Sequence, residues 1–214
     1  MKKFAVVLSG CGHQDGSEIT ESVSTLIALS QKGYEYECFA PDIEVEVINH
    51  VTGKPSGKRG ILAESARIAR GNIRPVSELK AANFSGVIFP GGYGAAVKLS
   101  TWGNHGAGCT VLPEIKFIIE DFYNAKKAIG AMCIAPTLVA KVLGSKKVKV
   151  TIGEDKETAQ EIEKTGARHE VCAVDSCVVD VANKVVTTPA YMYDAKPHQV
   201  FAGISALVNS LGSL

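Results

Sequence analysis

Three short apolar runs, each ending in a tight turn, determine which architecture this chain can adopt. They lie at residues 4–8, 87–89 and 128–133. Runs this short and this continuously apolar are typical of strands that are covered on both faces. Segments with helical periodicity separate them, and strands that alternate with helices predict a mostly parallel sheet with right-handed crossovers. We therefore expect an α/β fold with helices on both faces of the sheet.

Composition supports one globular domain. The chain has 214 residues, of which 46% are hydrophobic and 21% charged, and we expect residues 1–214 to form a single domain. A formal net charge of +1 gives no field that would favour nucleic acid or an anionic membrane. The longest apolar runs are too short to span a bilayer.

The cysteines indicate a reducing compartment. No two of the six cysteines are spaced as CxxC, and six cysteines in 214 residues are too few for a disulfide framework. We expect a cytoplasmic protein, with the mitochondrial matrix as the alternative if a longer precursor exists. Cys172 and Cys177 flank a predicted strand, but two further metal ligands are missing, so no metal is expected.

Several other elements can be predicted from local patterns. Ser17 occupies the position of a helix N-cap, and Ile19, Val23 and Ile27 follow at helical spacing. Residues 43–60 alternate and then become rich in Gly, Pro and Lys, which indicates a two-stranded ribbon. Residues 100–110 are predicted to be a long loop, and residues 148–153 a strand.

The parallel sheet would bring three loops together. In open α/β sheets, ligands bind beyond the carboxyl ends of the strands. The loops that follow residues 8, 89 and 132 all lie at this edge. The residues with catalytic potential are therefore expected in these loops.

Cys133 ends the third apolar run, and a helix-forming segment follows it. This is the arrangement of a nucleophile elbow, in which a strained turn presents the side chain above the sheet. Amides at the start of the next helix would lower the pKa of the thiol. The alternative is a buried cysteine that packs as a small apolar residue.

The glycine-rich loop at residues 90–94 follows the second run. Glycines let the backbone approach a ligand closely, so the amides of Gly91 and Gly92 are candidate oxyanion donors. The alternative is a simple tight turn. A dinucleotide fingerprint is disfavoured, because the glycines at residues 10–16 are out of register with its spacing.

Glu18 lies at the start of the first predicted helix and would face the same crevice. A carboxylate beside a thiol can hold or relay a proton. The alternative is an acid that merely complements the helix dipole. Of the five histidines, His13 is the best placed to assist, because its loop lies at the same edge.

Longer stretches of the sequence resemble a known family. SGCG near the start, CFAPD, ESARIARG, GGYGAAVKLS, MCIAP and KVVTTPAYM are similar to the ElbB family. These are class I glutamine amidotransferase-like proteins of the DJ/PfpI superfamily, often labelled isoprenoid-biosynthesis or glyoxalase-like. The resemblance covers nearly the whole chain. It implies a flavodoxin-like three-layer sandwich, with Cys133 as the nucleophile and Glu18 as its acidic partner.

The resemblance also implies a chemistry. It is glyoxalase III-type conversion of glyoxal or methylglyoxal to glycolate or lactate, without a cofactor, through a hemithioacetal on Cys133. Backbone amides near Gly92 and Ile134 would stabilise the oxyanion. Glutamine hydrolysis is disfavoured, because the late His-x-Glu pair of those amidotransferases is replaced by TTPAYMYD, and Ile134 stands where many superfamily enzymes have a His.

Other function classes stay open. One is a redox-responsive protein in which Cys133 is oxidised to a sulfinic acid. Another is a metabolite-binding module that keeps the fold without turnover. The expected partners are a small reactive aldehyde and a second copy in a homodimer.

Overall fold

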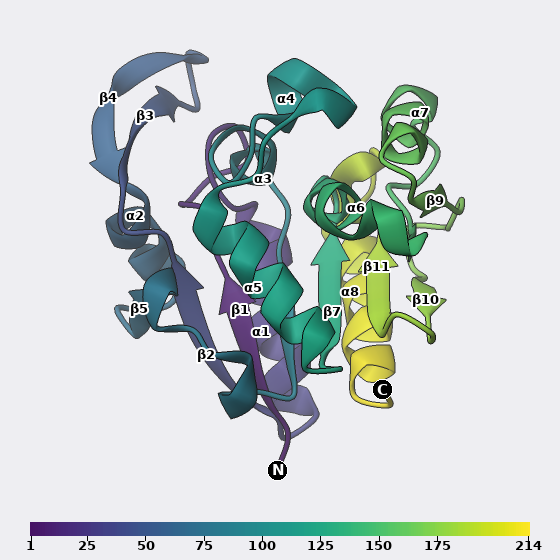
Figure 1. The fold of residues 1–214 in the computed structure, drawn as a ribbon. Helices are drawn as coiled ribbons and strands as arrows, with labels where there is room; N and C mark the ends of the chain where they lie inside the picture. The colour runs from purple at the N-terminus through teal and green to yellow at the C-terminus, as the bar shows by residue number, and fades with distance from the viewer.

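A seven-stranded sheet forms the centre of the molecule. The computed structural model describes residues 1–214, and its strand order is β10-β11-β7-β6-β1-β2-β5 (Figure 1). All neighbours are parallel except β10, which runs antiparallel to β11. The bounds are β1 Lys3–Val7, β2 Glu35–Ala40, β5 Ile73–Pro75, β6 Gly86–Phe89, β7 Ala128–Met132, β10 Val178–Asp180 and β11 Val185–Thr188. The mostly parallel sheet is confirmed.

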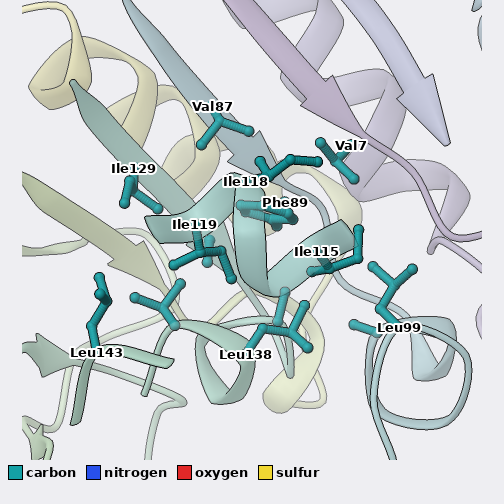
Figure 2. Close-up of a cluster of buried hydrophobic side chains, with 14 of the residues drawn as sticks. Val7, Val87, Phe89, Leu99, Ile115, Ile118, Ile119, Ile129, Leu138 and Leu143 are labelled. Atoms are coloured by element: carbon teal, nitrogen blue, oxygen red, sulfur yellow. The ribbon is translucent and has the colours of Figure 1, made fainter. Parts of the chain in front are cut away.

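Helices cover both faces of this sheet. Side chains of α1 (Ile19–Gln31) and α8 (Pro197–Leu211) pack on one face, together with Ile88 and Met132. Side chains of α5 (Pro113–Asn124) and α6 (Pro136–Leu143) pack on the other, where Figure 2 shows Val87, Phe89 and Ile129 in one cluster with Ile115, Ile119 and Leu138. Successive strand residues thus point to opposite cores, which explains the continuous apolar runs. The three-layer sandwich is confirmed.

Helix α1 presents an unexpected face to the sheet. Its buried residues are mainly small and polar, while Ile19, Val23 and Ile27 are 48, 39 and 44% exposed. Two of the buried hydroxyls bond back to the helix: Ser22 donates to the carbonyl of Glu18 at 2.7 Å, and Thr25 donates to the carbonyl of Glu21 at 2.8 Å. The buried residues are Glu21, Ser22, Ser24, Thr25, Ala28 and Leu29.

Other segments differ from the expectations in part. The ribbon at residues 43–60 is present as β3 (Glu44–Asn49) and β4 (Lys54–Gly60). The strand expected at residues 148–153 shrinks to β8 (Lys149–Val150), which pairs with β9 (Arg168–His169) outside the main sheet. The predicted loop at residues 100–110 contains a short helix, α4 (Trp102–His105).

Three further helices belong to the fold. They are α2 (Ile61–Ile68), α3 (Tyr93–Val97) and α7 (Lys156–Lys164). In Figure 1, α3, α4 and α7 lie towards the edge of the sheet to which the arrowheads of β7 and β11 point. No helix combines the length and the apolar character that crossing a membrane requires.

Candidate active site

Cys133 lies in a sharp turn immediately after β7. Its φ of 58° is in the left-handed region, which costs energy for any residue with a Cβ. The Cys133 amide donates to the carbonyl of Thr188 at 3.1 Å, which anchors the turn to β11. The side chain is 8% exposed. The strained turn that the sequence predicts is therefore present, and it places the sulfur at the carboxyl edge of the sheet.

Glu21 is the carboxylate that contacts this thiol. It is fully buried on the first turn of α1 and hydrogen-bonds with the Cys133 side chain. Its Oε2 accepts from the amide of Gly91 at 2.9 Å, and its Oε1 accepts from the amide of Tyr191 at 3.2 Å. The two amides fix the orientation of the carboxyl group, so one face of it is held against the sulfur.

Burial makes Glu21 an unusual acid. It raises the pKa of Glu21 from 4.5 to about 8, and the nearby charge of Glu18 acts in the same direction. The two backbone amides oppose this shift but do not outweigh the loss of water. At neutral pH the Glu21 carboxyl therefore keeps its proton, which it can donate to the adjacent sulfur.

The pKa of the Cys133 thiol is raised well above its usual value. Burial is the largest cause and the charge of Glu21 is the next. The amides of Gly92 and Ile134 hydrogen-bond to the sulfur and lower the pKa, as the sequence predicted for a helix N-terminus. The predicted net lowering is nevertheless wrong, because desolvation and Glu21 are stronger than two amides. Thiolate formation is thus coupled to the proton on Glu21.

A cavity of about 290 Å³ opens above the sulfur. Glu18, Gly92, Cys133 and Ile134, all named as site residues from the sequence, line it. Gly91 does not, because its amide is committed to Glu21. The other lining residues are His13, Tyr93, Asp155, Thr158, Tyr191 and Met192.

Glu18 occupies a different place from Glu21, although both lie in the same helical turn. Glu18 is the N-cap residue of α1, and its Oε2 accepts from the amide of Glu21 at 2.7 Å. Ser17, the predicted N-cap, is instead fully buried, and its hydroxyl accepts from the amide of Ser9 at 2.8 Å. Glu18 is half-buried and reaches the cavity. Its role in proton relay stays a prediction.

Both glycines of the second loop are required by the geometry. A Cβ at Gly91 would overlap with the Cβ of Cys133 and with the Glu21 carboxyl. Gly92 has a φ of 92°, and a Cβ there would overlap with the backbone of Gly16 and Glu18. The loop therefore brings its backbone against the sulfur at a distance that only glycine permits.

Two sequence relatives show which family this chain belongs to. A rat protein named "ES1 protein homolog, mitochondrial" is 46% identical over 221 residues, which cover 98% of this chain and 82% of the relative. A human protein named "Glutamine amidotransferase-like class 1 domain-containing protein 3, mitochondrial" is 45% identical with the same coverage. This chain belongs to the ES1 family of glutamine amidotransferase-like proteins. No family model matches this ES1-family chain.

Solved structures agree with this family assignment. An isoprenoid biosynthesis protein with an amidotransferase-like domain from Ehrlichia chaffeensis is 38% identical, with a TM-score of 0.94 over 100% of this chain and 99% of the other. Drosophila melanogaster DJ-1beta is 15% identical, with a TM-score of 0.57 over 99% and 94%, and this likeness concerns the fold alone. The amidotransferase-like family expected from the sequence is confirmed by these relatives, and neither of the two sequence relatives is named as a glyoxalase.

The names of the sequence relatives also bear on location. Both describe mitochondrial proteins, and so does that of a zebrafish ES1 protein that is 34% identical over 226 residues. The cytoplasmic location expected for this ES1-family chain has no support from them.

Proposed function

We propose that this ES1-family protein is a cofactor-independent enzyme of the glyoxalase III type, which converts a 2-oxoaldehyde to the corresponding 2-hydroxy acid. One observation carries the proposal: the Cys133 sulfur lies at the floor of a cavity, against two backbone amides and the protonated Glu21 carboxyl. A nucleophile, oxyanion donors and a proton store are the groups that this reaction needs. The mitochondrial names of the relatives make the mitochondrion the proposed location.

The first step is addition of the Cys133 thiolate to the aldehyde carbon. A carbon–sulfur bond forms and the carbonyl π bond breaks, so charge develops on the oxygen. The amides of Gly92 and Ile134 already converge on the sulfur, and they are therefore placed to stabilise the adjacent oxyanion. The ionised fraction of Glu21, which contacts the sulfur but does not line the cavity, accepts the thiol proton as the carbon–sulfur bond forms, and the new alkoxide takes up a proton from water in the cavity to give the hemithioacetal.

The second step moves hydrogen between the two carbons of the substrate. A base removes the proton from the thiol-bearing carbon, an enediol forms, and a proton returns to the neighbouring carbon, leaving a thioester. Glu18 is suited to this relay, because it lines the cavity and only one of its oxygens is used by the helix cap. Water then hydrolyses the thioester and releases glycolate or lactate. One carbon is oxidised and its neighbour reduced, so no external oxidant is required.

The test is a turnover assay on glyoxal and methylglyoxal with purified protein. Release of glycolate and lactate is followed by chromatography, with Cys133→Ser as the control. We expect Cys133→Ser to lower turnover by about 10³-fold or more, because a serine hydroxyl is a far weaker nucleophile without a dedicated base. Equal product from both proteins would overturn the assignment of Cys133.

The absence of product from the wild-type protein would refute the proposed activity. In that case intact mass after mild peroxide tests the redox alternative, in which Cys133 gains two oxygen atoms as a sulfinic acid. Such a gain at Cys133 without turnover would favour a redox-responsive protein.

A further inference from the structure

The cavity above Cys133 does not end there. A second cavity of about 630 Å³ adjoins it, and the two share Tyr93, Ile134 and Thr158 as a common wall. This distal cavity is more than twice as large as the one at the sulfur, which is about 290 Å³. Cavities of this size accommodate ligands far larger than a two- or three-carbon aldehyde.

Two helices form the walls of the distal cavity. Trp102 and His105 from α4 line one side, and Glu157 and Glu161 from α7 line the other. Glu161 is held in this wall, because its Oε2 accepts from the amide of Ala107 at 2.8 Å. The two cavities together form a groove that begins at the Cys133 thiol and continues between α4 and α7.

The carboxylates are the only charged side chains that line this groove when its two histidines, His13 and His105, are neutral. Neither cavity has a Lys or Arg among its lining residues, whereas Glu18, Asp155, Glu157 and Glu161 all contribute. Glu161 is already paired with Lys164, and Asp155 caps α7 by accepting from the amide of Thr158 at 2.9 Å. Glu157 makes neither an ion pair nor a hydrogen bond, and its side chain is exposed to the groove.

An aromatic ring lies at the junction of the two cavities. Tyr93 lines both cavities and is 54% exposed, so its ring is free to contact a ligand that extends from one to the other. An exposed ring beside carboxylates is favourable for a positively charged group and unfavourable for an anion. This observation is independent of the acidic residues and agrees with them.

We propose that the natural substrate is an extended, amine-bearing carbonyl compound, whose carbonyl reacts at Cys133 while its cationic arm lies in the distal cavity between α4 and α7. This inference rests on the proposed function, since it names the substrate class of the same site. It means that glyoxal and methylglyoxal fill only the proximal part of the groove.

The test uses two thiol probes of opposite charge. 2-(Trimethylammonio)ethyl methanethiosulfonate is cationic, and 2-sulfonatoethyl methanethiosulfonate is anionic. Each transfers its thioalkyl group to the Cys133 thiolate, forming a disulfide and releasing methanesulfinate. Peptide mapping by mass spectrometry gives the rate at Cys133 for each. Because a thiolate intrinsically favours the cationic reagent, each rate is divided by the rate of the same reagent with free 2-mercaptoethanol. We expect this normalised rate to be about tenfold higher or more for the cationic probe than for the anionic one.

A matched pair of variants separates the groove from the general charge of the protein. Asp155→Asn with Glu157→Gln removes two negative charges, and Asn retains the helix cap. The control is Glu114→Gln with Glu120→Gln, which removes two charges from α5, away from the groove. We expect the rate ratio to fall to about threefold or less in the first protein and to stay unchanged in the control. The single variant Glu157→Gln gives an intermediate ratio if the double variant is unstable.

The outcomes distinguish this inference from the proposed function. Equal normalised rates for the two probes on the wild-type protein, or an unchanged ratio in the Asp155/Glu157 variant, would overturn the inference even if methylglyoxal is turned over. A charge-dependent ratio without any acid product would instead refute the activity and leave the groove's preference for cations standing.

Discussion

Two carboxylates in one turn of α1 serve regions that differ in almost every physical respect. Glu21 belongs to the buried elbow, where two amides and a thiol hold it and its pKa is raised to about 8. Glu18 belongs to the open mouth of the cavity, where it caps the helix and faces solvent and ligand. The difference teaches that carboxylates three residues apart can meet different environments: Glu21 affects the pKa of the thiol, and in the proposed reaction Glu18 acts on the substrate.

The substitution Glu18→Gln is the most direct test of the different roles of Glu18 and Glu21. We expect turnover of methylglyoxal to fall by about 10²-fold, because the cavity loses its carboxylate base. The rate of Cys133 alkylation by iodoacetamide should change far less than turnover, since Glu18 affects the thiol only indirectly, through the pKa of Glu21. Full turnover in a folded Glu18→Gln protein would leave Glu18 with the role of a helix cap only.

Glu21→Gln, in contrast to Glu18→Gln, should directly change the alkylation rate of the Cys133 thiol. The charge of Glu21 raises the pKa of Cys133, so its removal should lower that pKa and allow the thiolate to form more readily. At pH 9, where Glu21 is ionised in the wild type, alkylation should become about tenfold faster, which corresponds to a pKa shift of about one unit. Glu18→Gln is the matched control. An unchanged alkylation profile in Glu21→Gln would mean that the two groups are not coupled.

The last prediction concerns stability, and its sign follows from the raised pKa of Glu21. Unfolding returns the pKa of Glu21 from about 8 to about 4.5, so between these values the unfolded chain releases a proton that the folded protein keeps. Stability therefore falls as pH rises through this window and levels off above it. We expect calorimetry to show a melting temperature about 10 °C lower at pH 8.5 than at pH 5, beyond the change seen in Glu21→Gln. Identical pH dependence in the two proteins would contradict a raised pKa.

The sequence was sufficient to predict the sheet and the elbow. Continuous apolar strands can only be buried on both faces, and a cysteine between such a strand and a helix start has few other geometries available. The long loop after β6 was less predictable. Its short helix α4 is stabilised by the burial of Trp102, a tertiary contact that no local pattern contains.

Glu21 was missed for a specific reason. The spacing of Ile19, Val23 and Ile27 is typical of a buried helix face, whereas the structure exposes these residues and buries the small polar ones between them. A charged residue on that buried side has no distinguishing sequence signal, except that it lies among Ser and Thr residues able to bond back to their own helix. The contact with Cys133 depends on this inverted packing.

The hydrogen bonds to Glu21 also have a consequence for the order of folding. Its carboxyl is held by amides 70 and 170 residues away along the chain, so the hydrogen bonds that position it span most of the polypeptide. Contacts of such long sequence separation form late, because much of the chain must be ordered first. A growing chain on the ribosome therefore lacks the assembled elbow until Tyr191 has emerged. Because the assembled elbow buries the Cys133 thiol and raises its pKa, a fall in alkylation at Cys133 is what marks completed synthesis and folding.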